Sequence, residues 1–276
     1  MSGKSDVGRK RKNNEDRFLI RPDLGFCLLV DGMGGEAAGE IASAIFTQTA
    51  LELFSFQKKW MPFPLQTAIV WLKERQKVKK WDESPSESIT FKDAQAVIQR
   101  SESHACKLVK AVFSQANKRI LQHVKKYPER AGMGCTAELI VFYKEGYLLG
   151  HVGDSRVYLY NEQLMQLTID HTLLQESIDK GLTASSREKE RLGKNVLIKA
   201  VGVEQRIIPD IEQGKIKTGD MFLLCSDGLT DKVDDTMLKK IVSKPLCLSK
   251  KSDVLISEAN NAGGHDNITV ILIEVL

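Results

Sequence analysis

Four aspartates stand at the ends of short apolar stretches, in the position where strands of a sheet stop. Asp31 follows FCLLV, Asp154 follows LLGHVG, Asp227 follows MFLLCS, and Asp266 precedes NITVILI. Three of them adjoin glycine, which permits tight turns and lets a backbone carbonyl approach a ligand. One Asp–Gly pair is usually a plain turn, whereas four carboxylates brought together repel one another unless a cation lies between them. The pattern therefore predicts a cation site.

The donor types narrow the choice of ion. Carboxylate and carbonyl oxygens favour hard cations such as Mg²⁺ or Mn²⁺, and no Cys/His spacing in the sequence matches a zinc site. A chain of 276 residues buries roughly 75% of its unfolded surface and needs no metal to fold. We therefore expect a catalytic metal centre rather than a structural one.

Composition and charge exclude several classes of protein. Hydrophobic residues make up 42% and charged residues 28% of the chain, as in ordinary globular proteins. No apolar run approaches the ~18 residues of a transmembrane helix, and the first residues lack the apolar core of a secretory signal. Five cysteines without a C-x-x-C pair fit reduced thiols. We expect a cytoplasmic protein with no membrane partner, and a net charge of +4 is too small to indicate nucleic acid.

Hydrophobic periodicity predicts the elements that position the aspartates. Strands are expected over 17–21, 26–30, 137–142, 147–152, 156–160, 163–167, 221–225 and 268–275, and helices over 39–54, 102–126 and 252–262. The four strands between 137 and 167 are expected to form an antiparallel meander, followed by a mobile, charged helical excursion over 173–197. Strands such as ELIVF and ITVILI are apolar on both faces and must be covered on both. The predicted fold is α+β, a four-layer sandwich of two antiparallel sheets flanked by helices.

The segment 57–101 departs from this pattern of predicted strands and helices. It contains all three tryptophans, and between 57 and 80 it carries seven Lys/Arg against one acid. We interpret it as an insertion or an elaborated helix–helix connection inside a single domain that spans 1–276. Aromatic and basic side chains are common anchors at interfaces, so one hypothesis is that 57–81 docks an acidic partner. The alternative is a solvated helix whose tryptophans pack onto the domain.

Eight sequence blocks occur in the order that one protein family shows. They are RKNNED (11–16), VDGMGGEAAGEIAS (30–43), GMGCTA (132–137), GHVGDSRVYLY (150–160), IDHT (169–172), KAVG (199–202), LLCSDGLTD (223–231) and GGHDNITV (263–270). In these blocks the chain resembles the metal-dependent serine/threonine phosphatases of the protein phosphatase 2C type, in their bacterial form. The resemblance covers nearly the whole chain except about 57–101.

The resemblance assigns roles to the aspartates that the spacing singled out. It implies that Asp31 bridges two metal ions and that the carbonyl of Gly32 is a neighbouring ligand. Asp227 and Asp266 match the terminal ligands that complete the pair.

The same resemblance assigns roles to residues around that pair. Asp154 and Asp231 match positions that hold a third, weaker metal, and Glu15 and Asp16 match acidic residues that hold metal-bound waters. Arg11 matches the arginine that grips the substrate phosphate, and its planar guanidinium suits bidentate contact with phosphate oxygens. Without the motif, the simpler interpretation of Arg11 is a solvent-exposed charge within the basic stretch 9–12.

Two positions depart from the family pattern. Met33 stands where eukaryotic members often carry a histidine that is proposed as general acid, although bacterial relatives commonly have methionine there. This leaves protonation of the leaving group to metal-bound water or to an unidentified acid. Cys135 replaces a residue that is usually threonine or serine, with no evident catalytic penalty.

The function implied is hydrolysis of phosphoserine and phosphothreonine in proteins by a hydroxide that bridges two Mn²⁺ or Mg²⁺ ions, with a third ion held more weakly. The substrates expected are phosphoproteins made by a serine/threonine kinase in bacterial signalling. One alternative is an inactive or weakly active member that serves as a regulatory binding module. Loss of a metal aspartate would favour that alternative, but Asp31, Asp227 and Asp266 are all present. A phosphatase with narrow specificity for one partner is a third reading.

Overall fold

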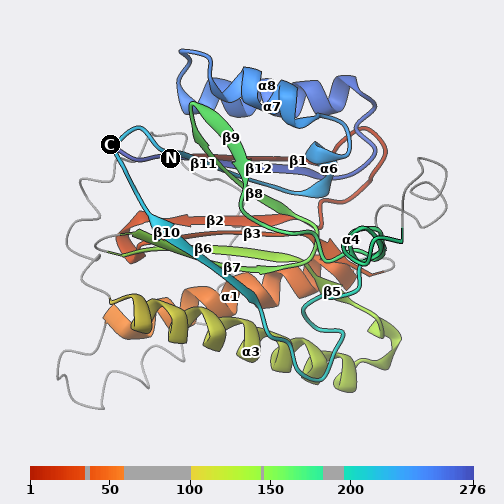
Figure 1. Cartoon of the computed structure of the whole chain (residues 1–276). Helices are drawn as coiled ribbons and strands as arrows, with labels where there is room; N and C mark the ends of the chain where they lie inside the picture. Colours follow the sequence, from red (N-terminus) through yellow and green to blue (C-terminus); the bar gives the residue numbers. More distant parts are fainter. Residues whose placement is uncertain (35–37, 59–100, 144–145, 183–195) are drawn as a thin grey trace, which may run out of the picture.

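The computed structural model describes residues 1–34, 38–58, 101–143, 146–182 and 196–276. In this part of the chain, two five-stranded antiparallel sheets pack face to face, and helices cover the outer face of each sheet (Figure 1). This confirms the predicted α+β class and its four layers. No described helix is long and apolar enough to cross a membrane.

Sheet I has the strand order β10-β7-β6-β3-β2 and sheet II the order β1-β12-β11-β8-β9. The strands of sheet I are β2 (Arg17–Arg21), β3 (Phe26–Val30), β6 (Ala137–Tyr143), β7 (Gly146–Val152) and β10 (Asp210–Lys215). Those of sheet II are β1 (Ser2–Asp6), β8 (Arg156–Asn161), β9 (Gln163–Gln166), β11 (Met221–Cys225) and β12 (Ile268–Glu274). A short ladder joins β4 (Gly32–Met33) to β5 (Gly134–Cys135).

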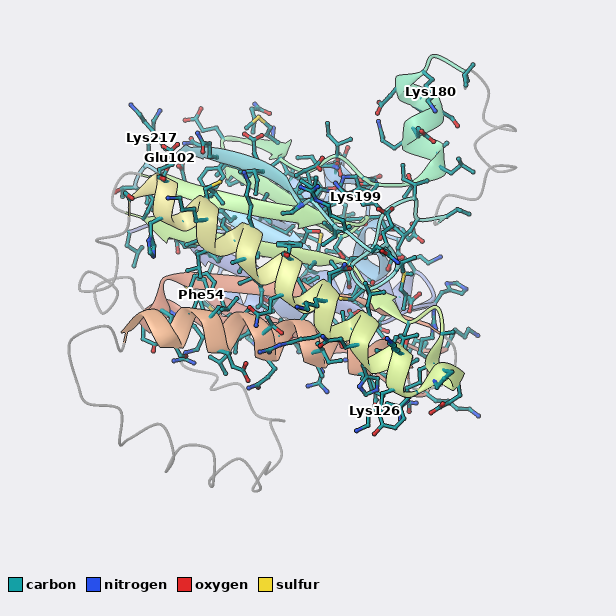
Figure 2. The ribbon with its side chains drawn as sticks, turned by 90° about the horizontal axis from the view of Figure 1, so that it is seen from below. Phe54, Glu102, Lys126, Lys180, Lys199 and Lys217 are labelled. Carbon is teal, nitrogen blue, oxygen red and sulfur yellow. The ribbon has the colours of Figure 1, made fainter. Side chains whose placement is uncertain are left out.

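Long helices cover both sheets. The helices α1 (Ala38–Lys58) and α3 (Glu102–Lys126) lie on sheet I, and α7 (Asp235–Val242) and α8 (Leu248–Asn261) lie on sheet II. Figure 2 shows α3 running from Glu102 to Lys126 beside α1, which carries Phe54. The shorter helices are α4 (Leu173–Asp179), α6 (Asp227–Thr230), η1 (Pro22–Leu24) and η4 (Pro128–Arg130).

Strand β3 shows how the apolar pattern builds the layers. Phe26, Leu28 and Val30 belong to the cluster under α1 and α3, whereas Cys27 and Leu29 belong to the cluster between the two sheets. Because successive side chains of a strand point to opposite faces, a strand that is apolar at every position fits only between two covering layers. Residue 31, directly after β3, is where this apolar run ends.

The predicted meander from 137 to 167 is wrong. The hairpins β6–β7 and β8–β9 exist, but β7 lies in sheet I and β8 lies in sheet II. The chain crosses between the sheets at residues 153–155, where Gly153 has a φ of 117° that glycine adopts without strain. On the other side, β8 pairs with β11, whose Leu224 faces Val157.

Several elements were not predicted. Strand β1 (SGKSD) and strand β10 (DIEQGK) are sheet-edge strands of polar composition, so they lack the apolar signal. Helix α7 was also missed. The helix expected over 173–197 is confirmed only as α4, because 183–195 lies outside the described residues. Of the segment 57–101, only residues 57, 58 and 101 are described, so its interpretation is not tested.

Candidate metal centre

The predicted site residues come from loops at one end of the sandwich, where strands of both sheets stop. Asp31 follows β3, Asp227 is the first residue of α6 after β11, and Asp266 lies two residues before β12. Figure 1 shows α6 and β5 on the same side of the molecule. Sheet I therefore supplies one aspartate to this end and sheet II supplies two.

Asp31 stands at the centre of the group. Burial raises its pKa well above the usual range, and the negative charges of four other aspartates raise it further. These are Asp16, Asp227, Asp154 and Asp266. Since a charge shifts a neighbour's pKa strongly only at short range, the structure brings together the four aspartates first noted in the sequence.

Hydrogen bonds to Thr136 hold the backbone at Asp31. The Thr136 N–H donates to the Asp31 carbonyl at 2.8 Å, and the Asp31 N–H donates to Thr136 Oγ1 at 3.2 Å. Thr136 Oγ1 also lies 2.9 Å from Ser155 Oγ, in the crossing between the sheets. One threonine thus ties the turn that carries Asp31 to the turn that carries Asp154.

Asp16 is buried between the two sheet II loops. Its Oδ2 accepts hydrogen bonds from Ser226 Oγ at 2.9 Å and from Thr269 Oγ1 at 2.6 Å. Burial raises its pKa to about 6, although these hydrogen bonds lower it. Its other oxygen, Oδ1, is buried and has no hydrogen-bond partner among the described residues, which is unusual for a carboxylate.

Asp227 and Asp154 continue the cluster from α6 to the crossing between the sheets. Burial and then the charges of Asp154 and Asp266 raise the pKa of Asp227 well above its usual range. Burial and the charge of Asp170 raise the pKa of Asp154 to about 6. The charge of Asp231, at the end of α6, acts on both. Asp231 therefore lies near both Asp154 and Asp227.

Arg11 and Glu15 approach from the loop between β1 and β2. Arg11 Nη2 lies 2.8 Å from Asp266 Oδ2, and this hydrogen bond raises the pKa of Arg11. Burial raises the pKa of Glu15, and the positive charge of Arg11 lowers it. Asn267 fixes this loop: its Oδ1 accepts the Glu15 N–H at 2.8 Å, and its Nδ2 donates to the carbonyl of Asn13 at 3.0 Å.

Gly32 lies where no larger residue fits. A Cβ at this position would collide with the carbonyl oxygen of Gly39 and would lie 2.7 Å from that of Glu15. Glycine therefore lets the start of α1, the β1–β2 loop and the end of β3 meet at one point.

The donor set fits hard divalent cations. The acidic side chains that converge here offer carboxylate oxygens, which Mg²⁺ and Mn²⁺ prefer. The pKa values of Asp31, Asp227, Asp16 and Asp154 are raised by burial and by neighbouring negative charges, which is the electrostatic condition that a cation relieves. No group of three or more His, Cys, Asp and Glu side chains in the described ranges has the arrangement of a ready-formed metal site.

Several supporting residues were not singled out from the sequence. Ser226, Thr269, Asn267 and Thr136 make the hydrogen bonds that hold the site, and each lies inside a motif already quoted as a block. His265, directly before Asp266, is exposed.

Comparison with known proteins agrees with this geometry. The family model described as protein phosphatase 2C matches residues 4–252. A serine/threonine phosphatase of Listeria welshimeri, stp, is 32% identical over 275 residues, covering 98% of this chain and 94% of the relative. Protein phosphatase PhpP of Streptococcus pneumoniae is 29% identical, covering 98% of this chain and 95% of the relative.

Solved structures are similar as well. The catalytic domain of the serine/threonine protein phosphatase PstP, solved in complex with two manganese ions, is 27% identical with a TM-score of 0.75 and covers 100% of this chain and 97% of that one. The serine/threonine phosphatase of S. agalactiae is 25% identical with a TM-score of 0.78 and covers 100% of this chain and 98% of that one.

Proposed function

The chain belongs to the protein phosphatase 2C family of metal-dependent serine/threonine protein phosphatases, and on that premise we propose which of its residues perform the reaction. The observation that carries this proposal is that the negative charges of Asp16, Asp227, Asp154 and Asp266 all act on the partly buried Asp31. The regulatory-only alternative gains no support, because the named relatives are phosphatases.

We propose that Asp31, the carbonyl of Gly32, Asp227 and Asp266 hold a pair of Mn²⁺ or Mg²⁺ ions. Asp31 occupies the bridging position, since it lies at the end of sheet I and faces ligands from sheet II. The negative charges that these partly buried carboxylates exert on one another support the assignment. Bound there, two divalent cations supply Lewis-acid activation of water and of the phosphoryl group.

Around this pair, we propose that Asp154 and Asp231 hold a third ion and that Glu15 and Asp16 hold metal-bound waters. The charge of Asp231 on Asp154 supports the first assignment. The buried Oδ1 of Asp16, which accepts no hydrogen bond from the part of the chain that the structure describes, supports the second. Ser226 and Thr269 keep the other oxygen of Asp16 in place.

Arg11 is proposed to bind the phosphate of the substrate. Its side chain is 51% exposed, so a phosphoprotein can reach it, while its Nη2 contacts Asp266 beside the proposed ions. A guanidinium offers parallel donors to two phosphate oxygens. Arg11 therefore positions the phosphorus next to the metal pair and neutralises charge on the non-bridging oxygens.

The substrates are phosphoproteins, and we propose that a serine/threonine kinase of the same signalling system makes them. The docking hypothesis for 57–81 rests on its composition alone, because 59–100 lies outside the described residues. Reversing Lys77, Lys79 and Lys80 to Glu tests it. Hydrolysis of a small aryl phosphate should persist, while dephosphorylation of the physiological protein should slow. Docking would be refuted if the variant lost the same fraction of wild-type activity on both substrates, or lost none on either.

The ligand assignment is tested with Asp227→Asn and Asp266→Asn, compared with Asp253→Asn as a control in an exposed ion pair with Lys4. Phosphopeptide hydrolysis is measured over a Mn²⁺ titration, and bound Mn²⁺ is counted by equilibrium dialysis. Both site variants should bind fewer ions and lose turnover, and the control should match the wild type. Full Mn²⁺ binding by either site variant would contradict the assignment.

A further inference from the structure

His171 and Gly153 are joined by two hydrogen bonds that run in opposite directions. The backbone N–H of His171 donates to the Gly153 carbonyl at 2.7 Å. The Gly153 N–H in turn donates to the imidazole Nδ1 of His171 at 2.9 Å. Gly153 directly precedes Asp154, so both backbone polar groups of the residue before a proposed metal ligand are hydrogen-bonded to one histidine.

The direction of the second hydrogen bond defines the state of the imidazole. Nδ1 accepts from Gly153, so the ring proton is on Nε2, which lies 3.1 Å from Asp210 Oδ2. Lys199 Nζ lies 2.6 Å from the other oxygen of Asp210 and so holds that carboxylate in place. Figure 2 shows Lys199 within the body of the molecule, whereas Lys180 at the end of α4 projects outward.

A second histidine supports the ring from one face. The rings of His151 and His171 stack with centroids 4.5 Å apart and planes 15° from parallel. His151 is buried, with Nδ1 2.8 Å from Glu138 and Nε2 2.8 Å from the carbonyl of Ile169. These contacts anchor the loop that carries His171 to strands β6 and β7. The imidazole is therefore fixed in position, in plane and in tautomer.

The turn that precedes Asp154 is contacted by Thr136 as well as by His171. Gly153 has a φ of 117°, and a Cβ there would collide with Thr136. Thr136 lies against the turn and contacts Ser155, while His171 holds the turn through the peptide of Gly153. Asp154 between them is buried. The direction of its carboxylate depends on the backbone that these two contacts hold.

We propose that His171 is a positioning residue: by accepting the Gly153 N–H at Nδ1, it sets the direction of the Asp154 carboxylate and thereby the affinity of the third metal ion. This rests on the proposed role of Asp154 as a ligand of that ion. The paired ions held by Asp31, Asp227 and Asp266 are not affected. Outer residues that orient metal ligands commonly contribute about 10- to 100-fold in metal affinity.

The geometry suggests two substitutions of similar polarity with opposite outcomes. In His171→Asn, the amide oxygen reaches the position of Nδ1 and can still accept from Gly153. In His171→Gln, the amide lies one bond further out, toward Asp210, and the Gly153 N–H loses its acceptor. Both variants lose the ring stack on His151 equally, so a difference between them reports the Gly153 hydrogen bond. His104→Asn, at an exposed position on α3, is the control.

The experiment measures free Mn²⁺ by electron paramagnetic resonance during a titration of each protein. Asp154→Asn is included to identify the weaker class of sites. We expect His171→Gln to weaken that class by about 10-fold or more, with the tighter class unchanged. His171→Asn should stay within about threefold of the wild type, and excess Mn²⁺ should restore phosphopeptide turnover in His171→Gln. Thermal melting without metal checks that both variants fold.

The outcomes separate the two proposals. If Asp154→Asn removes the weaker class but His171→Gln and His171→Asn bind alike, the positioning role of His171 is wrong and the ligand assignment stands. If Asp154→Asn leaves the weaker class intact, the ligand assignment fails and the role of His171 fails with it. A loss of the tighter class in His171→Gln would also overturn the proposal, because the histidine would then act on the whole site.

Discussion

Arg11 Nη2 donates to Asp266 Oδ2 at 2.8 Å, so the proposed phosphate-binding cation and a proposed metal ligand form an ion pair. The pair joins the loop between β1 and β2 to the turn before β12. Both side chains are partly exposed, at 51% and 34%, and a pair of this kind contributes little to stability. The contact instead places the guanidinium next to one of the carboxylates that we propose as metal ligands.

Replacing Arg11 by alanine should weaken substrate binding. Hydrogen bonds to charged groups contribute about 1.5–3 kcal/mol, so KM for a phosphopeptide should rise by about 10- to 100-fold. The ions bound should be unchanged, because Arg11 is not a ligand. Steady-state kinetics at saturating Mn²⁺ measures this. Lys10 is an exposed neighbour in the same loop, and the control Lys10→Ala should leave KM unchanged. An unchanged KM in Arg11→Ala would show that Arg11 is only a surface charge.

Replacing Asp31 by asparagine should abolish turnover. The change removes the charge at the proposed bridging position while keeping the shape of the side chain. We expect a loss of roughly 100-fold or more in kcat, because the site can no longer activate water. Single-turnover hydrolysis of a phosphopeptide measures it, and near-wild-type rates would refute the bridging role.

The same substitution should stabilise the metal-free protein, and more at pH 8 than at pH 6. Burial and four nearby negative charges raise the pKa of Asp31. A carboxyl whose pKa is higher in the folded than in the unfolded state lowers the free energy of unfolding. This destabilisation is complete at pH values above the folded pKa and decreases as the pH falls below it. Asparagine carries no such cost at any pH.

Urea denaturation in the presence of a chelator, at both pH values, measures that difference. Added Mn²⁺ should stabilise the wild type more than Asp31→Asn, because the ion replaces the protons that relieve the repulsion. Asp253→Asn should behave as the wild type. A variant less stable than the wild type at pH 8 would show that Asp31 holds the fold together without metal.

Thr136→Val should loosen the site without changing its shape. The substitution removes the hydroxyl that accepts the Asp31 N–H and contacts Ser155 Oγ. An unsatisfied buried group costs about 1–3 kcal/mol, so thermal stability should fall by this amount and turnover should fall with it. Thr136→Ser retains the hydroxyl and should recover most of both. Equal stability of the two variants would exclude the hydrogen bonds as the cause.

Local pattern alone determined much of the fold. The limits of α3 follow from its apolar spacing, and they agree with the structure at 102 and 126. Strand β3 was bounded correctly because its apolar run ends at Asp31. The position of each aspartate relative to its strand end is also a property of the sequence. These features depend on which face of an element is buried, and periodicity reports that directly.

Only the tertiary structure decided which strands pair and which side chains support the site. Strand β8 pairs with β11 rather than continuing the sheet of β7, and the polar β1 pairs with β12 through a register that joins Ser2 to Leu272. Asp16 finds Ser226 and Thr269 more than 200 positions away. Hydrophobic periodicity shows which face of a helix or strand is buried, but it does not show which other element covers that face. Pairing and hydrogen-bond partners depend on contacts between distant residues, which form only when the two sheets pack.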